Sequence, residues 1–290
     1  MLTKILVKHK IVHITLLLGA ALLLLSGCNA GSTNQNTTAV PTSSTVASAS
    51  AFIRHSPSGT VILHWDHTSH NLDVQLALTG LAEKSVHPAM IMAGSCKNPG
   101  KTLYALPHLN GTAIGFANIK TTIKNVTAGI PETGWAVSVS NGPGTSSADQ
   151  SAAITCANVF NPTASTSVSQ DITAALLNAF SPNQNVSGAA DLTISNKQLQ
   201  VSVTLKGLVP ASKHMAHIHY GSCASQGPIV YGLKTIVANA AGDATSVTLI
   251  PNVSVIPRNG WYINVHLGAE NSRSQTMSDP IACGDITQFH

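Results

Sequence analysis

The stretch His214-Met215-Ala216-His217-Ile218-His219-Tyr220-Gly221-Ser222-Cys223 has a counterpart 127 residues earlier, His87-Pro88-Ala89-Met90-Ile91-Met92-Ala93-Gly94-Ser95-Cys96. Outside this stretch, Gly207-Leu208 and Cys283 match Gly80-Leu81 and Cys156 at the same shift. A repeat of this length predicts two tandem copies of one domain, at residues 58–162 and 188–290, each of a usual domain size.

Within each copy the apolar residues recur with a period of two. Leu199–Leu205 and Trp261–His266 alternate apolar with polar side chains, and Leu72–Leu78 and Trp135–Ser140 do the same in the first copy. This pattern is typical of half-buried antiparallel strands. We therefore predict an all-β fold of two tandem Greek-key-type β-sandwiches, with a short helix near Asp171 to Phe180 in the linker at 163–187.

The composition excludes two broad classes of protein. Of the 290 residues 43% are hydrophobic and only 9% are charged, so the chain has enough apolar material for a core and is not mainly disordered. Three lysines lie in the first 27 residues, and the remainder carries 12 basic against 11 acidic side chains. This balance lacks the electrostatic footprint of a nucleic-acid-binding protein.

The N-terminal segment has the pattern of a secretion signal. Lys4, Lys8 and Lys10 precede an apolar run from Ile11 to Leu25, which is too short for a convincing membrane span. The sequence Leu25-Ser26-Gly27-Cys28 resembles the bacterial lipoprotein cleavage box, which implies a signal peptide at 1–27 and a lipid on Cys28. The alternative is an ordinary secreted protein with an incidental cysteine.

The Ser-, Thr-, Ala- and Asn-rich residues that follow predict a disordered stalk at 28–57. Together with the lipid, this stalk predicts an attachment to the membrane, at the outer face of the cytoplasmic membrane in the cell envelope. No protein partner is indicated.

Four cysteines remain when Cys28 is set aside. They are Cys96, Cys156, Cys223 and Cys283, and no two of them form a Cys-x-x-Cys pair. An even number in a secreted chain indicates structural disulfides. Because equivalent copies should close equivalent loops, we expect the pairs Cys96–Cys156 and Cys223–Cys283.

Three histidines of the second copy are expected on one face of two strands. His217 and His219 flank the apolar Ile218, and His266 lies opposite the apolar side of its own strand. Alternate side chains point to opposite faces, so all three imidazoles should lie outside the core. If the strands are neighbours, these imidazoles form a candidate copper or zinc site, with His214 nearby as a fourth ligand or as a partner of the ligands. The alternative is a surface cluster that hydrogen-bonds nearby loops.

These residues also resemble a known family. The run from His217 to Cys223 and the ending Ile281-Ala282-Cys283-Gly284-Asp285-Ile286 look like the copper-ligand strand and the disulfide-closing strand of Cu,Zn superoxide dismutase. With Val265-His266 between them, the same motifs are similar to the CHRD domain, an extracellular β-sandwich module. The resemblance places His217, His219 and His266 on copper-ligand positions, and Cys223 and Cys283 on the disulfide.

The sequence lacks residues that the dismutases use for catalysis. No histidine lies between His219 and His266, where the dismutases carry a bridging histidine and zinc ligands. Pro280 stands where they carry an arginine that attracts superoxide, so the steering charge is missing. We therefore expect metal binding without dismutase activity.

The first copy has lost the histidines. Met90, Met92 and Ser140 stand at the positions of the three candidate ligands. Two thioethers with His87 close by would suit Cu(I), a soft ion. The alternative is that the methionines cover apolar surface at a domain contact.

Other chemistry has little support in the sequence. His64, His67 and His70 fall between two strand patterns, so we interpret them as polar residues of a hairpin loop. There is no Gly-rich phosphate loop, Gly-x-Ser-x-Gly elbow or His-Glu-x-x-His pair. The sequence predicts an envelope protein that binds copper or zinc in its second copy. The alternatives are a metal-free surface scaffold or adhesion module and a copper-only superoxide dismutase.

Overall fold

The computed structural model describes residues 47–177, 179–269 and 274–288. The predicted signal peptide, Cys28 with its predicted lipid and the first part of the predicted stalk lie outside these residues. Within the described ranges, no helix has the length and apolar character needed to cross a membrane.

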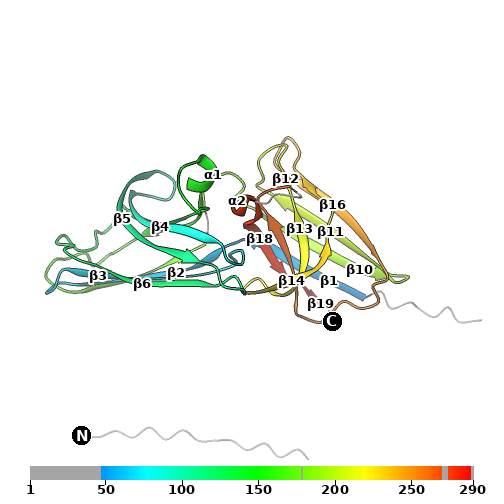
Figure 1. The fold of residues 1–290 in the computed structure, drawn as a ribbon, viewed down its shortest axis with the longest axis horizontal. Helices are drawn as coiled ribbons and strands as arrows, with labels where there is room; N and C mark the ends of the chain where they lie inside the picture. The colour runs from blue at the N-terminus through cyan, green and yellow to red at the C-terminus, as the bar shows by residue number, and fades with distance from the viewer. Residues whose placement is uncertain (1–46, 178, 270–273, 289–290) are drawn as a thin grey trace, which may run out of the picture. The chain divides into compact units, whose positions relative to one another are not determined.

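The prediction of an all-β fold is confirmed, and the strands form two lobes (Figure 1). The first lobe consists of β2 (Ser58–Asp66), β3 (Asn71–Thr79), β4 (Val86–Gly94), β5 (Pro99–Asn110), β6 (Ala117–Ile123), β7 (Trp135–Ser140), β8 (Ala153–Val159) and β9 (Gln170–Leu176), with the one-turn helix α1 (Ala148–Ser151) between β7 and β8.

The second lobe has the remaining elements. They are β1 (Ala47–His55), β10 (Ser187–Ser195), β11 (Gln198–Lys206), β12 (Lys213–His214), β13 (Ala216–Ser222), β14 (Ser225–Gly232), β15 (Ile236–Val237), β16 (Ala244–Pro251), β17 (Trp261–His266), α2 (Gln275–Ser278), β18 (Pro280–Asp285) and β19 (Thr287–Gln288).

The first lobe is a two-sheet sandwich. One sheet has the order β6-β3-β2-β9 and the other the order β5-β4-β7-β8, and all neighbours in both are antiparallel. Alternate side chains of both sheets fill one core, in which Leu63, Trp65 and Leu72 of the first sheet meet Ile91 and Val137 of the second. The period-two pattern thus places one face of each sheet inside.

The second lobe repeats this order with one difference. The order β14-β13-β17-β18 matches β5-β4-β7-β8, and β16-β11-β10 matches β6-β3-β2. In the first lobe, β9 pairs with β2. In the second lobe, β1 takes the equivalent place and pairs with β10. Strand β1 pairs with β10 through Ile53 and then with β18 at Arg54 and His55, so it joins the two sheets at a corner.

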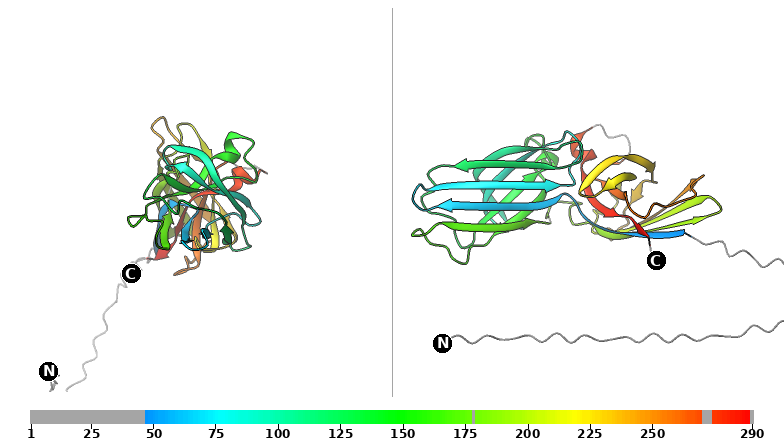
Figure 2. Two further views of the ribbon diagram at one scale, coloured as in Figure 1. Left: turned by 90° about the vertical axis from the view of Figure 1, so that its left-hand side faces the viewer. Right: turned by 90° about the horizontal axis from the view of Figure 1, so that it is seen from below.

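Two expectations about the segments outside the predicted copies were wrong. Residues 47–55, which we assigned to the disordered stalk, form β1 and complete the second lobe; Figure 2 shows this strand, in blue, running along that lobe. The helix expected near Asp171 to Phe180 is absent from the residues described there, because residues 170–176 form β9 on the edge of the first lobe.

Both errors have a physical reason. In β1 the inward residues Ala49, Ala51 and Ile53 are at most 2% exposed, but two of them are alanines within a Ser- and Ala-rich stretch, which hides the alternation. In β9 the alanines and leucine favour a helix, and pairing with the edge of β2 overrides that preference.

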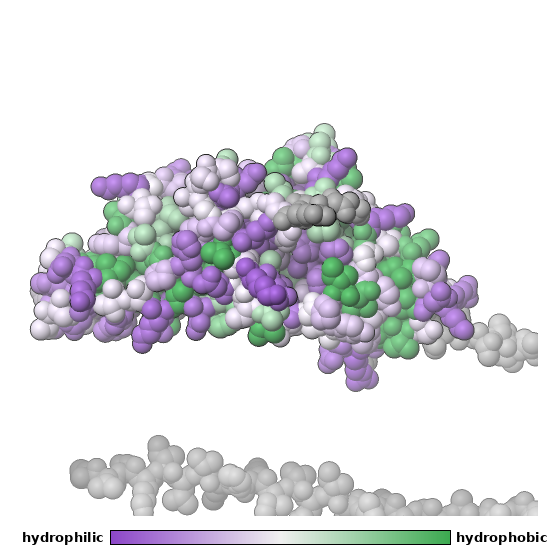
Figure 3. Space-filling model, viewed as in Figure 1, coloured by the Kyte–Doolittle hydropathy of each residue, from purple (hydrophilic) through white to green (hydrophobic). Residues whose placement is uncertain are grey.

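Both predicted disulfides are present. Cys96 bonds to Cys156 and Cys223 to Cys283, each across a sequence separation of 60 residues. In each lobe the bridge ties the turn after β4 or β13 to a strand of the same sheet, β8 or β18. On the face seen in Figure 3, exposed apolar side chains are interspersed with polar ones.

Candidate metal centre

Strands β13 and β17 are neighbours, and they bring the three predicted histidines together. His217 pairs with Asn264 and His219 with Tyr262, so both imidazoles share the sheet face from which His266 projects. One ring nitrogen from each of the three residues lies within 4.8 Å of the other two. The Nδ1 atom of His217 is 3.3 Å from the Nε2 atom of His266.

The histidines project away from the apolar core, as predicted, and Ile218 and Val265 point into it with no exposed surface. His217 and His219 are half-buried. His266, however, is only 8% exposed, because α2 covers its strand end. The site is therefore more enclosed than a surface cluster on an open sheet.

Backbone carbonyl groups fix the tautomers of two of the histidines. His219 Nδ1 donates to the Gly227 carbonyl oxygen at 2.9 Å, and His266 Nδ1 donates to the Ser278 carbonyl oxygen at 2.6 Å. Because a carbonyl oxygen can only accept, both protons reside on Nδ1 and both Nε2 atoms keep a lone pair. The Nε2 atom of His219 is buried and has no hydrogen-bond partner.

Burial keeps these rings neutral. The pKa of His266 is lowered to about 4, mainly by desolvation and to a smaller extent by the nearby His217 and His219. Desolvation also lowers the pKa of His219. Since a metal binds only the unprotonated nitrogen, the site is ready for a metal ion at neutral pH without first losing a proton from either ring.

The distances suit a first-row metal ion. An ion bound at about 2.1 Å holds two nitrogens about 3.4 Å apart in tetrahedral geometry. The 3.3 Å separation between His217 Nδ1 and His266 Nε2 is close to this value; it is a hydrogen bond that His217 donates, and a metal ion on these two atoms would replace it. The third nitrogen lies within 4.8 Å of both and would have to move closer. Imidazole nitrogens suit zinc and copper rather than calcium or magnesium.

His214 does not join the cluster as a fourth ligand. Its Nδ1 donates to the carbonyl oxygen of His266 at 3.0 Å, and its Nε2 accepts from the Ser212 hydroxyl at 2.7 Å. Both nitrogens are therefore engaged, and the residue is fully buried. His214 instead fixes the backbone of His266, which was the other role considered for it.

The first lobe keeps the buried histidine that holds the backbone of the neighbouring strand, but it lacks the three ligand histidines. His87 Nδ1 donates to the carbonyl oxygen of Ser140 at 3.0 Å, and its Nε2 accepts from the Ser85 hydroxyl at 2.8 Å. These bonds repeat those of His214 one for one. Because Ser140 stands where the second lobe has His266, a tri-imidazole site is absent from the described first lobe.

Met90 and Met92 line a pocket of about 380 Å³, but His87 is not part of it. The predicted combination of two thioethers with His87 therefore does not form, because the imidazole is turned inward to Ser140 and Ser85. The Met90 sulfur accepts a hydrogen bond from the Thr102 hydroxyl at 3.6 Å. Pro99, Phe180 and Pro182 contribute apolar surface to the same pocket.

His64, His67 and His70 contact separate partners; His67 and His70 lie in the predicted β2–β3 turn, whereas His64 lies in β2. His64 bonds to Asp171 at 2.7 Å and His67 to Ser169 at 3.1 Å, while His70 stacks on Trp65. In the part of the chain that the structure describes, His217, His219 and His266 form the single group of three metal-binding side chains.

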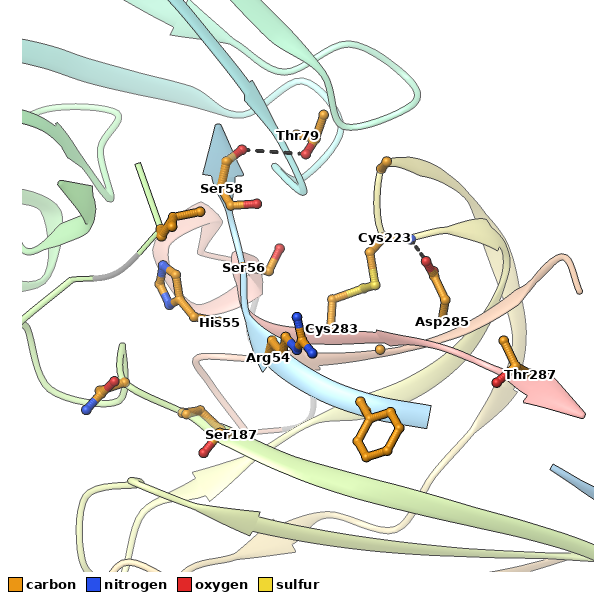
Figure 4. Close-up of a pocket in the computed structure, with 16 residues that line it drawn as sticks. Arg54, His55, Ser56, Ser58, Thr79, Ser187, Cys223, Cys283, Asp285 and Thr287 are labelled. Atoms are coloured by element: carbon orange, nitrogen blue, oxygen red, sulfur yellow. Dashed lines mark hydrogen bonds between the residues drawn. A yellow bond between two sulfur atoms is a disulfide. The ribbon is translucent and has the colours of Figure 1, made fainter. Parts of the chain in front are cut away.

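A larger cavity of about 780 Å³ lies beside the Cys223–Cys283 disulfide (Figure 4). Arg54, Ser56, Ser187 and Asp285 contribute polar groups to its wall, and Asp285 accepts a hydrogen bond from the Cys223 backbone. None of the three clustered histidines lines it. The histidine cluster that the sequence indicated is therefore outside this cavity.

Tyr262 is a neighbour of the cluster that the sequence analysis did not single out. Its ring stacks on His219 with the centroids 5.1 Å apart. Burial raises the pKa of its phenol to about 12. The signal was available, because Tyr262 shares the period-two face of His266, but an aromatic residue in a strand is usually read as core.

The comparisons with known proteins concern the same region. The CHRD domain family model matches residues 172–273, a range that contains all three clustered histidines. No curated protein matches the chain. The CHRD resemblance is thus confirmed for most of the second copy.

Proposed function

We propose that this protein binds a copper or zinc ion through His217, His219 and His266 and works as a metal-binding module of the cell envelope. The observation that carries the proposal is the arrangement of the three nitrogens. They lie within 4.8 Å of one another, and carbonyl oxygens hold two of the rings in the tautomer that leaves Nε2 available.

The buried, unpaired Nε2 atom of His219 favours a role as a metal ligand over a role in surface hydrogen bonding. The Nε2 atom of His219 has no hydrogen-bond partner, and a buried unpaired acceptor costs about 1–3 kcal/mol. A metal ion on this nitrogen removes the cost.

The proposal is one of binding rather than of dismutase catalysis. Pro280 occupies the position of the missing arginine, and it pairs with His266 at the start of β18. Without a guiding charge at that position, steering of an anion to the metal is weaker.

The location in the envelope is part of the same proposal. Cys28, with a lipid attached, would hold the protein on the outer face of the cytoplasmic membrane, in agreement with the apolar run and cleavage box of the sequence. Two disulfides suit an oxidising compartment.

Titration calorimetry with Cu(II) and Zn(II) on chelator-stripped protein tests the proposal. We expect one equivalent of metal per chain, and nitrogen splitting in the electron paramagnetic resonance spectrum of the Cu(II) form. Replacing His217, His219 and His266 together by Ala should abolish both.

His64, His67 and His70, at the end of β2 and in the turn that follows, provide a matched control. Replacing all three by Ala removes the same number of imidazoles from the surface. This variant should bind like the wild type. Equal uptake by the cluster variant and the wild type would overturn the proposal. No uptake by the wild type would leave the metal-free scaffold as the better description.

A further inference from the structure

Helix α2 connects the candidate metal site to the first lobe. Its first residue, Gln275, makes three hydrogen bonds to that lobe. The side-chain oxygen accepts from the Val86 backbone nitrogen at 3.0 Å, and the side-chain nitrogen donates to the carbonyl oxygens of Val86 and Asn141 at 3.0 and 3.1 Å.

A fourth bond comes from the opposite direction. The Asn141 side-chain nitrogen donates to the carbonyl oxygen of Thr276 at 3.1 Å, and both residues are buried. We call these four residues, Val86, Asn141, Gln275 and Thr276, the interlobe joint. Four polar contacts fix α2 in both position and rotation, which one contact could not do.

The other end of the same helix holds a metal-site ligand. Ser278, the last residue of α2, accepts the Nδ1 proton of His266 on its carbonyl oxygen. Leu267, which follows His266, donates its backbone N–H to Asp279 at 3.0 Å, so the helix end and the ligand strand are tied together twice. A helix of four residues is only about 5 Å long, so a shift at Gln275 is transmitted to Ser278.

The joint is specific to α2. At the repeat shift of 127 residues, Gln275 corresponds to Ala148 of α1, which has no side chain able to make these bonds. On the other side, Val86 and Asn141 flank the positions of the first copy where the metal ligands have been lost. In that copy the buried His87 still donates a hydrogen bond to the carbonyl oxygen of Ser140, the residue before Asn141.

We infer that the first lobe positions the metal site of the second lobe, and that Gln275 is the positioning residue that carries the effect. Held by Val86 and Asn141, it keeps the Ser278 carbonyl oxygen against His266 and so keeps the His266 Nε2 lone pair available. The metal part of this inference rests on the proposed function. The tautomer of His266 does not depend on it.

The experiment compares Gln275→Ala and Asn141→Ala with the wild type, with Gln200→Ala as a control because Gln200 is an exposed glutamine of β11. Long-range ¹H–¹⁵N spectra of the metal-free proteins at neutral pH report the tautomer of His266. Chelator competition then gives the affinity for Zn(II). Thermal unfolding shows that each variant is folded.

The wild type and Gln200→Ala should have His266 protonated on Nδ1. Both joint variants should show a mixture of tautomers and a loss of Zn(II) affinity of about tenfold, the usual effect of removing a group that orients a ligand. Asn141 is in the other lobe, so a purely local role of α2 predicts no change in that variant.

An unchanged tautomer in both folded joint variants would overturn the inference. A wild type that takes up no metal would refute the proposed function and leave the tautomer comparison as the test of the joint. A wild type that binds Zn(II) and joint variants that bind it equally well would refute the positioning role.

Discussion

Asp279, the residue after α2, is a buried acid whose replacement should change the pH dependence of stability. Its side chain is buried, the side chain of Gln275 is its nearby polar neighbour, and its Oδ1 atom is 4.0 Å from Nε2 of His87 in the other lobe. Burial raises the pKa of Asp279 to about 8 and lowers that of His87 to about 4. At neutral pH the two side chains are therefore a neutral acid beside a neutral imidazole, not an ion pair.

The direction of this pH dependence follows from the number of protons that the folded and unfolded states bind. An unfolded chain releases the Asp279 proton near pH 4, whereas the folded protein keeps it until about pH 8. Between these values the folded state binds more protons, so this residue makes the protein less stable as the pH rises. From pH 6.5 to 8.0 the loss amounts to about 1.5 kcal/mol.

The substitution Asp279→Asn removes the titrating group and keeps the shape. Histidines buried in the neutral form act in the opposite direction, but they are present in both proteins and cancel in the comparison. We expect the difference in unfolding free energy, variant minus wild type, to grow by about 1.5 kcal/mol between pH 6.5 and 8.0. Guanidinium unfolding followed by tryptophan fluorescence at three pH values measures it.

The control is Asp149→Asn, which removes an exposed carboxyl group from α1. If the difference between Asp279→Asn and the wild type stays constant across the range, the carboxyl group is already ionised at pH 6.5 and the reasoning from burial is wrong.

Three further predictions concern the fold and the repeat. Cys223→Ser opens a loop of 60 residues and should reduce the unfolding free energy by about 4 kcal/mol, whereas a loss below about 1 kcal/mol in denaturant titrations would contradict the loop-entropy argument. Deleting residues 47–55 should expose the second lobe to proteolysis, and a peptide of that sequence should restore resistance; a deletion variant as resistant as the wild type would refute the pairing of β1. Converting Met90, Met92 and Ser140 together to His should raise Zn(II) uptake from one to two equivalents per chain, and unchanged stoichiometry would mean that the two sites are not structurally equivalent.

The sequence predicted the features that depend on local alternation. His217 and His219 on one face with Ile218 on the other follow from the strand period alone, and the cysteine pairs follow from the repeat. The contact of His266 with the other two needed one further assumption, that β13 and β17 are neighbours. The structure meets that assumption.

The groups that hold the ligands could not be predicted in the same way. The partners of His219 and His266 are the carbonyl oxygens of Gly227 and Ser278, and every residue of the chain carries such an oxygen. Which one faces a histidine depends on the β14 hairpin and on α2. The fold therefore decides which ring nitrogen of each histidine carries the proton, even though the histidines themselves can be recognised from the sequence.

The place of β1 changes how the chain must be attached. A stalk that ended at residue 57 would lead into the first lobe, but β1 begins at Ala47 and belongs to the second lobe. If Cys28 carries the lipid, only 18 residues lie between it and Ala47, and the greatest span from Cys28 to Ala47 is about 65 Å. The lobe with the histidine cluster is then the one joined directly to the anchor. The first lobe is an insertion between β1 and β10, so cutting the linker near residue 180 would leave the first lobe connected to the second lobe through the covalent continuity of β1 and β2.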